Sequence, residues 1–145
     1  MFRLLTRPAL WLTAIVLWVV TIYFLSSTSK TMPEGGFEIP HIDKILHFGY
    51  FFGGGIILTT YLLLLKGSDA PIPVRVIIPV LFFAVIGALD EYHQTFTPGR
   101  SGNDPFDWLA DLLGAATGTF LAHRLHPLLL RISGRSPNSP KKTIH

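Results

Sequence analysis

Hydrophobic residues in this chain fall into four long runs that are separated by short polar stretches. The runs cover residues 9–25, 45–65, 74–93 and 106–126, and the first two contain no Asp, Glu, Lys or Arg. A helix needs about 20 residues to cross the hydrocarbon core of a bilayer. The third and fourth runs meet this length when their polar ends lie at the interface. The pattern predicts an all-α membrane protein whose four transmembrane helices pack as a compact bundle.

The composition favours the membrane class over a soluble one. Of the 145 residues, 49% are hydrophobic and 14% are charged, against about 25% charged in a typical soluble domain. The net charge of +3 would suggest nucleic acid in a soluble chain. Here we assign it to basic residues that flank membrane segments, and we expect no nucleic-acid partner. The chain has no cysteine, which excludes disulfides and thiolate chemistry.

The basic residues are unevenly distributed between the two sides of the predicted bundle. Nine of the twelve Lys and Arg lie at the N-terminus, in the loop between runs two and three, or near the C-terminus. The other side holds Lys30, Lys44 and Arg100, together with eight of the nine acids. The positive-inside rule then predicts that both termini are cytoplasmic. We expect one transmembrane domain, residues 1–130, and a basic, disordered cytoplasmic tail, residues 131–145.

Polar residues at the start of the second run share one side of the predicted helix. Asp43, His47 and Tyr50 are spaced i, i+4, i+7, and Lys44 lies beside them within reach of His47. An ionised side chain at the bilayer centre costs about 2.5–3.5 kcal/mol. We therefore expect these residues to face a polar cavity near the outer surface.

The fourth run begins with a similar stripe. Asp107, Asp111, Gly114 and Gly118 are spaced i, i+4, i+7, i+11 and lie on one helix face. Acids above glycines predict a hydrated upper site over a tight helix contact.

Glycines in the second run admit two interpretations. Gly49 and Gly53 form a small-residue face suited to close helix packing. The triplet at residues 53–55 could instead unwind the helix, as in substrate-binding helices of transporters. Packing at Gly53 is the favoured interpretation. In the third run, Pro79 is expected to kink the helix without breaking it.

The third run ends in the polar sequence ALDEYHQTFTPGR, residues 88–100. Asp90 and Glu91 lie at a helix C-terminus, where the macrodipole favours cations, so they need partners. Adjacent carboxylates in a partly dry site could serve as an acid/base pair, or they could simply end the helix. Arg100 follows a Pro-Gly turn and suits a phosphate or carboxylate. Its alternative role is an ion pair with Asp90 or Asp107 that holds the loop.

The same residues offer histidine and carboxylate groups to a metal. His47 and His93 lie among acids, but compact metal-binding spacing such as H-E-x-x-H is absent from the sequence. We therefore predict no metal and no cofactor.

Three blocks of these residues resemble a known family. D43-K44-I45-L46-H47-F48-G49-Y50 is close to D-K-x-x-H-x-x-x-Y, with the tyrosine one position early. D90 to R100 follows D-E-x-x-Q-x-F-x-P-G-R, and D107 to G118 follows D-x-x-A-[DN]-x-x-G-x-x-x-G. Together they resemble the VanZ-like family of small membrane proteins over roughly residues 43–120. The resemblance implies an envelope protein related to teicoplanin-resistance proteins, and it supplies no mechanism.

Three functions follow from these observations and stay open at this point. The first is recognition, or recognition with modification, of an anionic lipid-linked or cell-wall-related molecule in a cavity facing outward from the cell membrane. The second is a non-enzymatic module that binds or transports a lipid or ion, and the third is a structural or regulatory membrane partner. Whether the chain is an enzyme, and its oligomeric state, stay open. The catalytic candidates are Asp90, Glu91 and His47. The candidate ligand-binding residues are Asp43, Lys44, Tyr50, Gln94, Arg100, Asp107 and Asp111.

Overall fold

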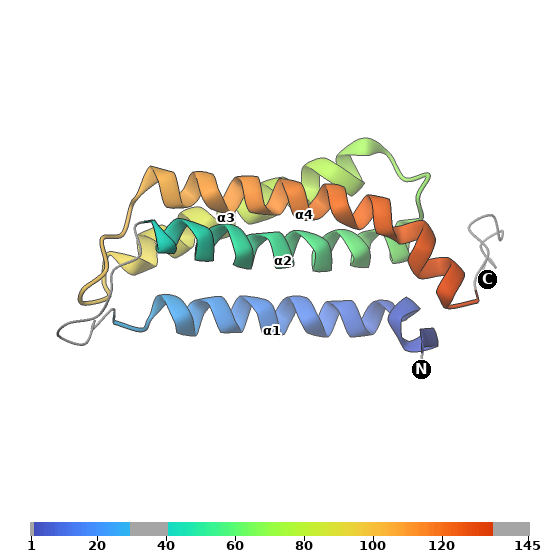
Figure 1. Cartoon of the computed structure of the whole chain (residues 1–145), viewed down its shortest axis with the longest axis horizontal. Coiled ribbons are helices and arrows are strands. Elements are labelled where there is room, and N and C mark those ends of the chain that lie inside the picture. Colours follow the sequence, from blue (N-terminus) through green and yellow to red (C-terminus); the bar gives the residue numbers. More distant parts are fainter. Residues whose placement is uncertain (1, 30–40, 135–145) are drawn as a thin grey trace.

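The computed structural model describes residues 2–29 and 41–134, and the regular secondary structure within these ranges is all helical. A short 3-10 helix η1 (Phe2–Thr6) precedes α1 (Pro8–Ser26) and α2 (Ile42–Lys66). A π-helical turn η2 (Pro73–Ile77) leads directly into α3 (Ile78–Gln94), and α4 (Pro105–Ile132) follows. The long helices run side by side, with α2 between α1 and α4 in the view of Figure 1. The predicted all-α class is confirmed.

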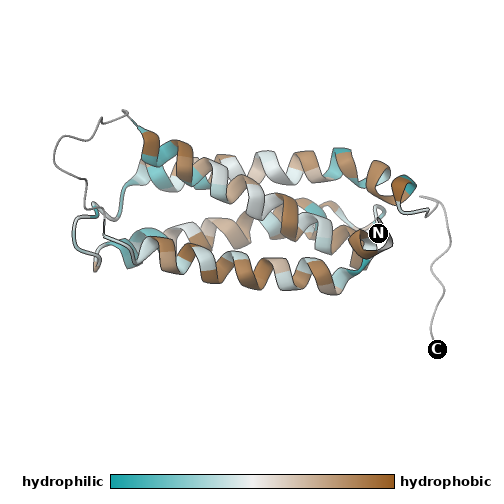
Figure 2. Cartoon of the chain, turned by 60° about the horizontal axis from the view of Figure 1, so that its bottom comes forward, coloured by the Kyte–Doolittle hydropathy of each residue, from teal (hydrophilic) through white to brown (hydrophobic). Residues whose placement is uncertain are grey.

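Three of the helical segments are long and apolar enough to cross a membrane. They are Pro8–Ser26, Ile42–Lys66 and Pro73–Gln94. Large apolar side chains on them point outward: Leu17, Leu81 and Val85 are each more than half exposed. Hydrophobic residues predominate along the helices, and hydrophilic residues gather toward their ends (Figure 2). Outward apolar faces of this length are what a lipid environment requires.

The fourth helix is longer than its apolar run predicts. It starts at Pro105 after the capping residue Asp104, whose carboxylate accepts a hydrogen bond from the backbone N–H of Phe106. It continues through Pro127 to Ile132, beyond the predicted end at residue 126 and past the predicted domain boundary at residue 130. The predicted tail lies mostly outside the described residues.

Close contact between α2 and α4 depends on the glycines of α4. A Cβ placed on Gly114 would overlap the carbonyl oxygen of Phe48 and lie 3.0 Å from the backbone nitrogen of Phe52. A Cβ on Gly118 would overlap the carbonyl oxygen of Phe52 in the same way. The predicted tight contact below Asp111 is therefore confirmed.

The glycine face predicted on α2 was wrong by one or two positions. A Cβ on Gly49 or Gly53 would meet nothing within 4 Å. Instead, Gly55 lies against the backbone of Ala115, and Gly54 lies against the rings of Trp18 and Phe83. α2 is continuous through this triplet, so the alternative of an unwound helix is not realised.

Aromatic side chains fill the centre of the bundle. Phe51 and Phe83 are buried, and Trp18 of α1 meets both rings edge-on at centroid distances of 5.3 and 5.0 Å. The indole N–H of Trp18 also donates to the carbonyl oxygen of Tyr50 at 2.9 Å. This cluster joins α1, α2 and α3 directly beneath the polar end of the bundle.

Candidate functional site

The ten predicted site residues come together at one end of the bundle. The N-termini of α2 and α4, the C-terminal ends of α1 and α3, and the loop at residues 95–104 meet there. Helix phase and antiparallel connections explain the convergence, since each polar stripe faces inward at the same level. The residues are linked by hydrogen bonds, ion pairs or a shared pocket: Asp43, Lys44, His47, Tyr50, Asp90, Glu91, Gln94, Arg100, Asp107 and Asp111.

Lys44 lies between three carboxylates. Its Nζ is 2.8 Å from Asp104 Oδ2, 3.0 Å from Asp107 Oδ1 and 3.6 Å from Asp43 Oδ2. The ammonium beside Asp104 lowers the pKa of that carboxyl below its usual value, helped by the backbone N–H of Phe106. Lys44 therefore joins the start of α2 to the start of α4.

Asp104 was the site residue that the sequence interpretation did not single out. It caps α4, and its backbone N–H donates to Glu91 Oε2 at 2.7 Å. The local signal was present, because an Asp directly before a Pro is a typical helix start. That signal identifies a cap and does not reveal that the same carboxylate also holds Lys44.

A histidine and two buried acids form the centre of the site. His47 Nδ1 lies 2.9 Å from Asp111 Oδ1, and His47 Nε2 lies 4.0 Å from Glu91 Oε1. Asp111 is fully buried. Its second oxygen, Oδ2, lies against Gly87 of α3, only 2.7 Å from where a Cβ on that residue would be, so the glycine makes room for it. Glu91 Oε1 and Asp111 Oδ2 are buried and have no hydrogen-bond partner among the described residues. Buried carboxylate oxygens without partners are costly, so they mark a place for a proton, a water or a cation.

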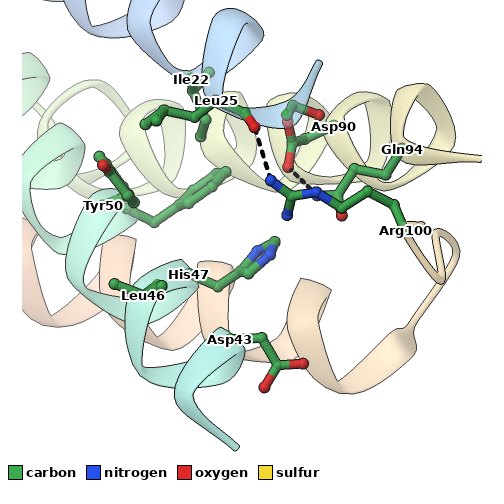
Figure 3. A pocket seen from close by; sticks show the side chains of 11 residues that line it. Ile22, Leu25, Asp43, Leu46, His47, Tyr50, Asp90, Gln94 and Arg100 are labelled. Atoms are coloured by element: carbon green, nitrogen blue, oxygen red, sulfur yellow. Dashed lines mark hydrogen bonds between the residues drawn. The ribbon is translucent and has the colours of Figure 1, made fainter. Parts of the chain in front are cut away.

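A pocket of about 150 Å³ opens beside this centre. Ile22 and Leu25 of α1 and Leu46 of α2 form an apolar wall, whereas His47 and Asp90 form a polar one. Figure 3 shows His47 from α2 and Arg100 from the loop after α3 reaching toward the same space. Asp43, Tyr50 and Gln94 also line it, and Gln94 donates to Asp90 Oδ2 at 2.8 Å. The pocket is therefore amphiphilic.

Arg100 bonds to a partner that the sequence did not predict, namely the C-terminal end of α1. Its Nη2 donates to the carbonyl oxygen of Leu25 at 2.7 Å, and its Nε donates to that of Thr28 at 3.1 Å. The ion pair with Asp90 or Asp107, one of the two alternatives for this residue, is not formed. The carbonyls at a helix C-terminus carry partial negative charge, which attracts a guanidinium. Arg100 thereby fastens α1 while still lining the pocket.

Among the residues that the structure describes, two groups of three side chains have ligand atoms close enough to hold a metal ion. In the first, Asp43, Asp104 and Asp107 already surround Lys44 Nζ, so an ammonium takes the place of a cation. In the second, His47, Asp90 and Glu91 present atoms within 4.8 Å of one another. Imidazole and carboxylate ligands of this kind suit Zn²⁺ or Mn²⁺.

The comparison with known protein families found a match. The VanZ/LLP1 family profile matches residues 10–129, which include most of α1 and α4, all of α2 and α3, and all ten site residues. Comparison with curated proteins and with solved structures found no match. The family resemblance read from the three motifs is confirmed, and the chain belongs to the VanZ/LLP1 family of membrane proteins.

Proposed function

We propose that this protein binds an amphiphilic, anionic lipid-linked molecule of the cell envelope in the pocket between α1, α2 and α3. The observation that carries the proposal is the composition of the pocket, in which an apolar wall from Ile22 and Leu25 faces polar groups and Arg100. An acyl or isoprenoid chain fits the apolar wall. A polar headgroup fits the opposite side.

The headgroup chemistry follows from the side chains that line the pocket. A guanidinium binds phosphate or carboxylate through paired N–H donors, so Arg100 is the anion-binding group. Asp43 and Asp90 are acceptors and suit hydroxyl groups. Lys44 is held by three carboxylates, so it supports the site and does not itself bind the ligand. A headgroup that carries both an anion and hydroxyls, such as a phosphorylated sugar, matches this set.

A second candidate is proton transfer by His47, favoured by its contact with Asp111. The 2.9 Å contact at Nδ1 orients the ring and leaves Nε2 toward Glu91 Oε1 and the pocket. A histidine oriented by a buried carboxylate is suited to general acid/base work. In this version the bound molecule is modified as well as held.

We further propose that α4 crosses the membrane with the other three helices and that both termini are cytoplasmic. α4 runs alongside α2 for most of its length (Figure 1). Most basic residues in the described part of the chain lie toward the helix ends opposite the acidic site, and the positive-inside rule assigns that side to the cytoplasm. The pocket then faces the outer side of the cell membrane.

Topology is tested with reporters that are active only outside the cytoplasm. Fusions after residue 36 and after residue 103 should be active, and a fusion after residue 145 should be inactive. Activity at residues 103 and 145 alike would show that α4 does not cross. The reverse pattern at all three would turn the pocket to the cytoplasm.

Ligand binding is tested by native mass spectrometry of protein extracted gently with its own lipids. We expect the wild type and an Arg124→Ala control to retain a bound phosphate-bearing lipid, which Arg100→Ala loses. Arg100→Gln separates the roles of this residue, because an amide can still donate to the α1 carbonyls but carries no charge. Ligand retained by a folded Arg100→Gln protein would contradict anion binding at Arg100.

The same preparation separates the two candidates. Under both candidate functions, Glu91→Gln should keep the bound lipid. If the variant accumulates a form of the ligand that the wild type converts, the protein also modifies the molecule that it binds. A structural role alone predicts no retained ligand in wild type and loss of folded protein in the Arg100 and Glu91 variants, with the Arg124→Ala control still folded.

A further inference from the structure

We propose that a second site, at the opposite end of the bundle, binds a phosphate-bearing group. A pocket of about 440 Å³ lies there between the end of α2, η2 and the last turns of α4. It is lined by Arg75, His123 and His126 together with Ser68 and apolar residues. None of these residues takes part in the acidic site.

His126 supplies the first observation that points to a ligand. Its side chain is buried, with 5% of the residue exposed, although it is a polar residue near a helix end. Nδ1 lies 3.2 Å from Ser68 Oγ, whereas Nε2 is buried and has no partner among the described residues. Buried polar atoms in native proteins are almost always paired with protein, water or ligand, so Nε2 requires one of these in the pocket.

Arg75 supplies the second observation that points to a ligand. Its Nη1 donates to the carbonyl oxygen of Ser68 at 2.9 Å, which fixes the guanidinium over the pocket. Its Nε is buried and also has no partner among the described residues. The side chain forms no ion pair within the described part of the chain, in contrast to Lys44 at the other end. An oriented, uncompensated guanidinium is suited to the oxygens of a phosphate.

The backbone that carries Arg75 is held in place from α4. His123 Nε2 lies 2.9 Å from the carbonyl oxygen of Arg75. A carbonyl can only accept, so Nε2 carries the hydrogen. In a regular α-helix the N–H of residue 79 would donate to the carbonyl of Arg75, but Pro79 has no N–H. The chain forms the π-helical turn η2 at this point. π-helical turns are rare and occur often at functional sites.

The remaining lining decides the class of ligand. Three nitrogen-bearing side chains converge without a carboxylate among the lining residues, and the positive charge of Arg75 repels a cation, so the lining favours an anion. Leu63, Ile72 and Phe120 add an apolar border. Basic pockets between transmembrane helices bind lipid headgroups by this combination of charge and apolar surface. A lipid phosphate and a soluble phosphate share the chemistry, and the experiment distinguishes them.

The test uses the full chain in dodecyl maltoside and follows thermal unfolding. Inorganic phosphate, phosphatidylglycerol and phosphatidylcholine are added separately to wild type, Arg75→Gln and His126→Gln. We expect phosphatidylglycerol to raise the melting temperature of wild type and phosphatidylcholine to leave it unchanged. Arg75→Gln should lose at least half of the shift. A comparable shift with inorganic phosphate alone would identify a soluble phosphate group as the ligand.

Two controls keep the result interpretable. Arg131→Gln removes an exposed charge at the same end that does not line the pocket, and it should keep the full shift. Arg100→Ala removes any part of the shift that arises at the other site, so the shift that remains measures the second site alone. Should Arg75→Gln fail to fold, native mass spectrometry of His126→Gln provides the comparison through its count of bound phosphatidylglycerol. An unchanged shift in folded Arg75→Gln and His126→Gln, or an equal loss in Arg131→Gln, would overturn the proposal.

Discussion

Replacing Gly114 with alanine tests whether the backbone contact between α2 and α4 positions the His47–Asp111 pair. Gly114 lies one turn from Asp111, and its partner on α2, Phe48, directly follows His47. The new Cβ would overlap the Phe48 carbonyl oxygen and lie 3.1 Å from its carbon. Backbone atoms cannot rotate away, so the two helices must separate.

The structure sets the size of the effect. Overpacking costs about 1–3 kcal/mol. A separation of about 0.6 Å would stretch the 2.9 Å contact between His47 and Asp111 to the limit of a hydrogen bond, and such bonds in membranes are worth about 0.6–1.7 kcal/mol. Alanine returns about 1 kcal/mol of helix propensity. The net expected loss in the free energy of unfolding is about 1–4 kcal/mol.

The assay follows helical circular dichroism in dodecyl maltoside as the fraction of sodium dodecyl sulfate rises. Gly53→Ala is the matched control, because its Cβ meets nothing within 4 Å. It should leave the midpoint unchanged or raise it, whereas Gly114→Ala should lower it and also release the bound lipid. If Gly114→Ala is as stable as Gly53→Ala, the close backbone contact does not hold the site together.

Three further predictions concern single interactions. Lys44→Met should lower the free energy of unfolding by about 1.5–3 kcal/mol, since it leaves the buried carboxylate of Asp107 without the ammonium group that contacts it. Thermal unfolding measures this loss, and Arg131→Met, which removes an exposed cation, should have no comparable effect. Thr119→Val should cost about 0.6–1.7 kcal/mol, because it leaves the buried hydroxyl of Thr59 without its 3.0 Å partner. The double variant with Thr59→Val should recover most of that loss, and an additive loss would contradict the pairing. Because the pKa of Asp104 is lowered in the folded protein, its ionised carboxylate contributes to the stability of the fold. That contribution is complete above the usual Asp pKa of about 4 and is lost as the pH falls through the lower pKa of the folded state. The difference in melting temperature between wild type and Asp104→Asn should therefore be constant from pH 7 to about 5 and shrink below about 4. A difference that disappears already at pH 6 would refute the assignment.

Helix phase made the acidic site predictable. Residues spaced i, i+4, i+7 must share a helix face, and alternating helix directions bring the polar starts of α2 and α4 level with the end of α3. The ten residues therefore gather as expected. Their polar character inside apolar runs was the signal, because lipid-facing charges are costly.

Contacts that depend on rotation or turn geometry were not predictable in the same way. A small-residue face on α2 at Gly49 fits the same spacing rule as the observed contact at Gly55, and only tertiary packing decides between them. Arg100 follows Gly99, which has a φ of 76°, a conformation that glycine adopts readily. The turn at Gly99 directs the Arg100 side chain toward α1. Periodicity carries no information about such a turn.

The bonds between Arg100 and the end of α1 have a consequence for biosynthesis. Leu25 and Thr28 precede Arg100 by 75 and 72 residues, so the ribosome releases α1 long before its partner exists. α1 is the most apolar and the least buried of the three candidate spans. A helix with these properties can enter the bilayer alone and remain there. α1 is therefore made before Arg100, and its end can be secured only after α3 and the following turn have been made.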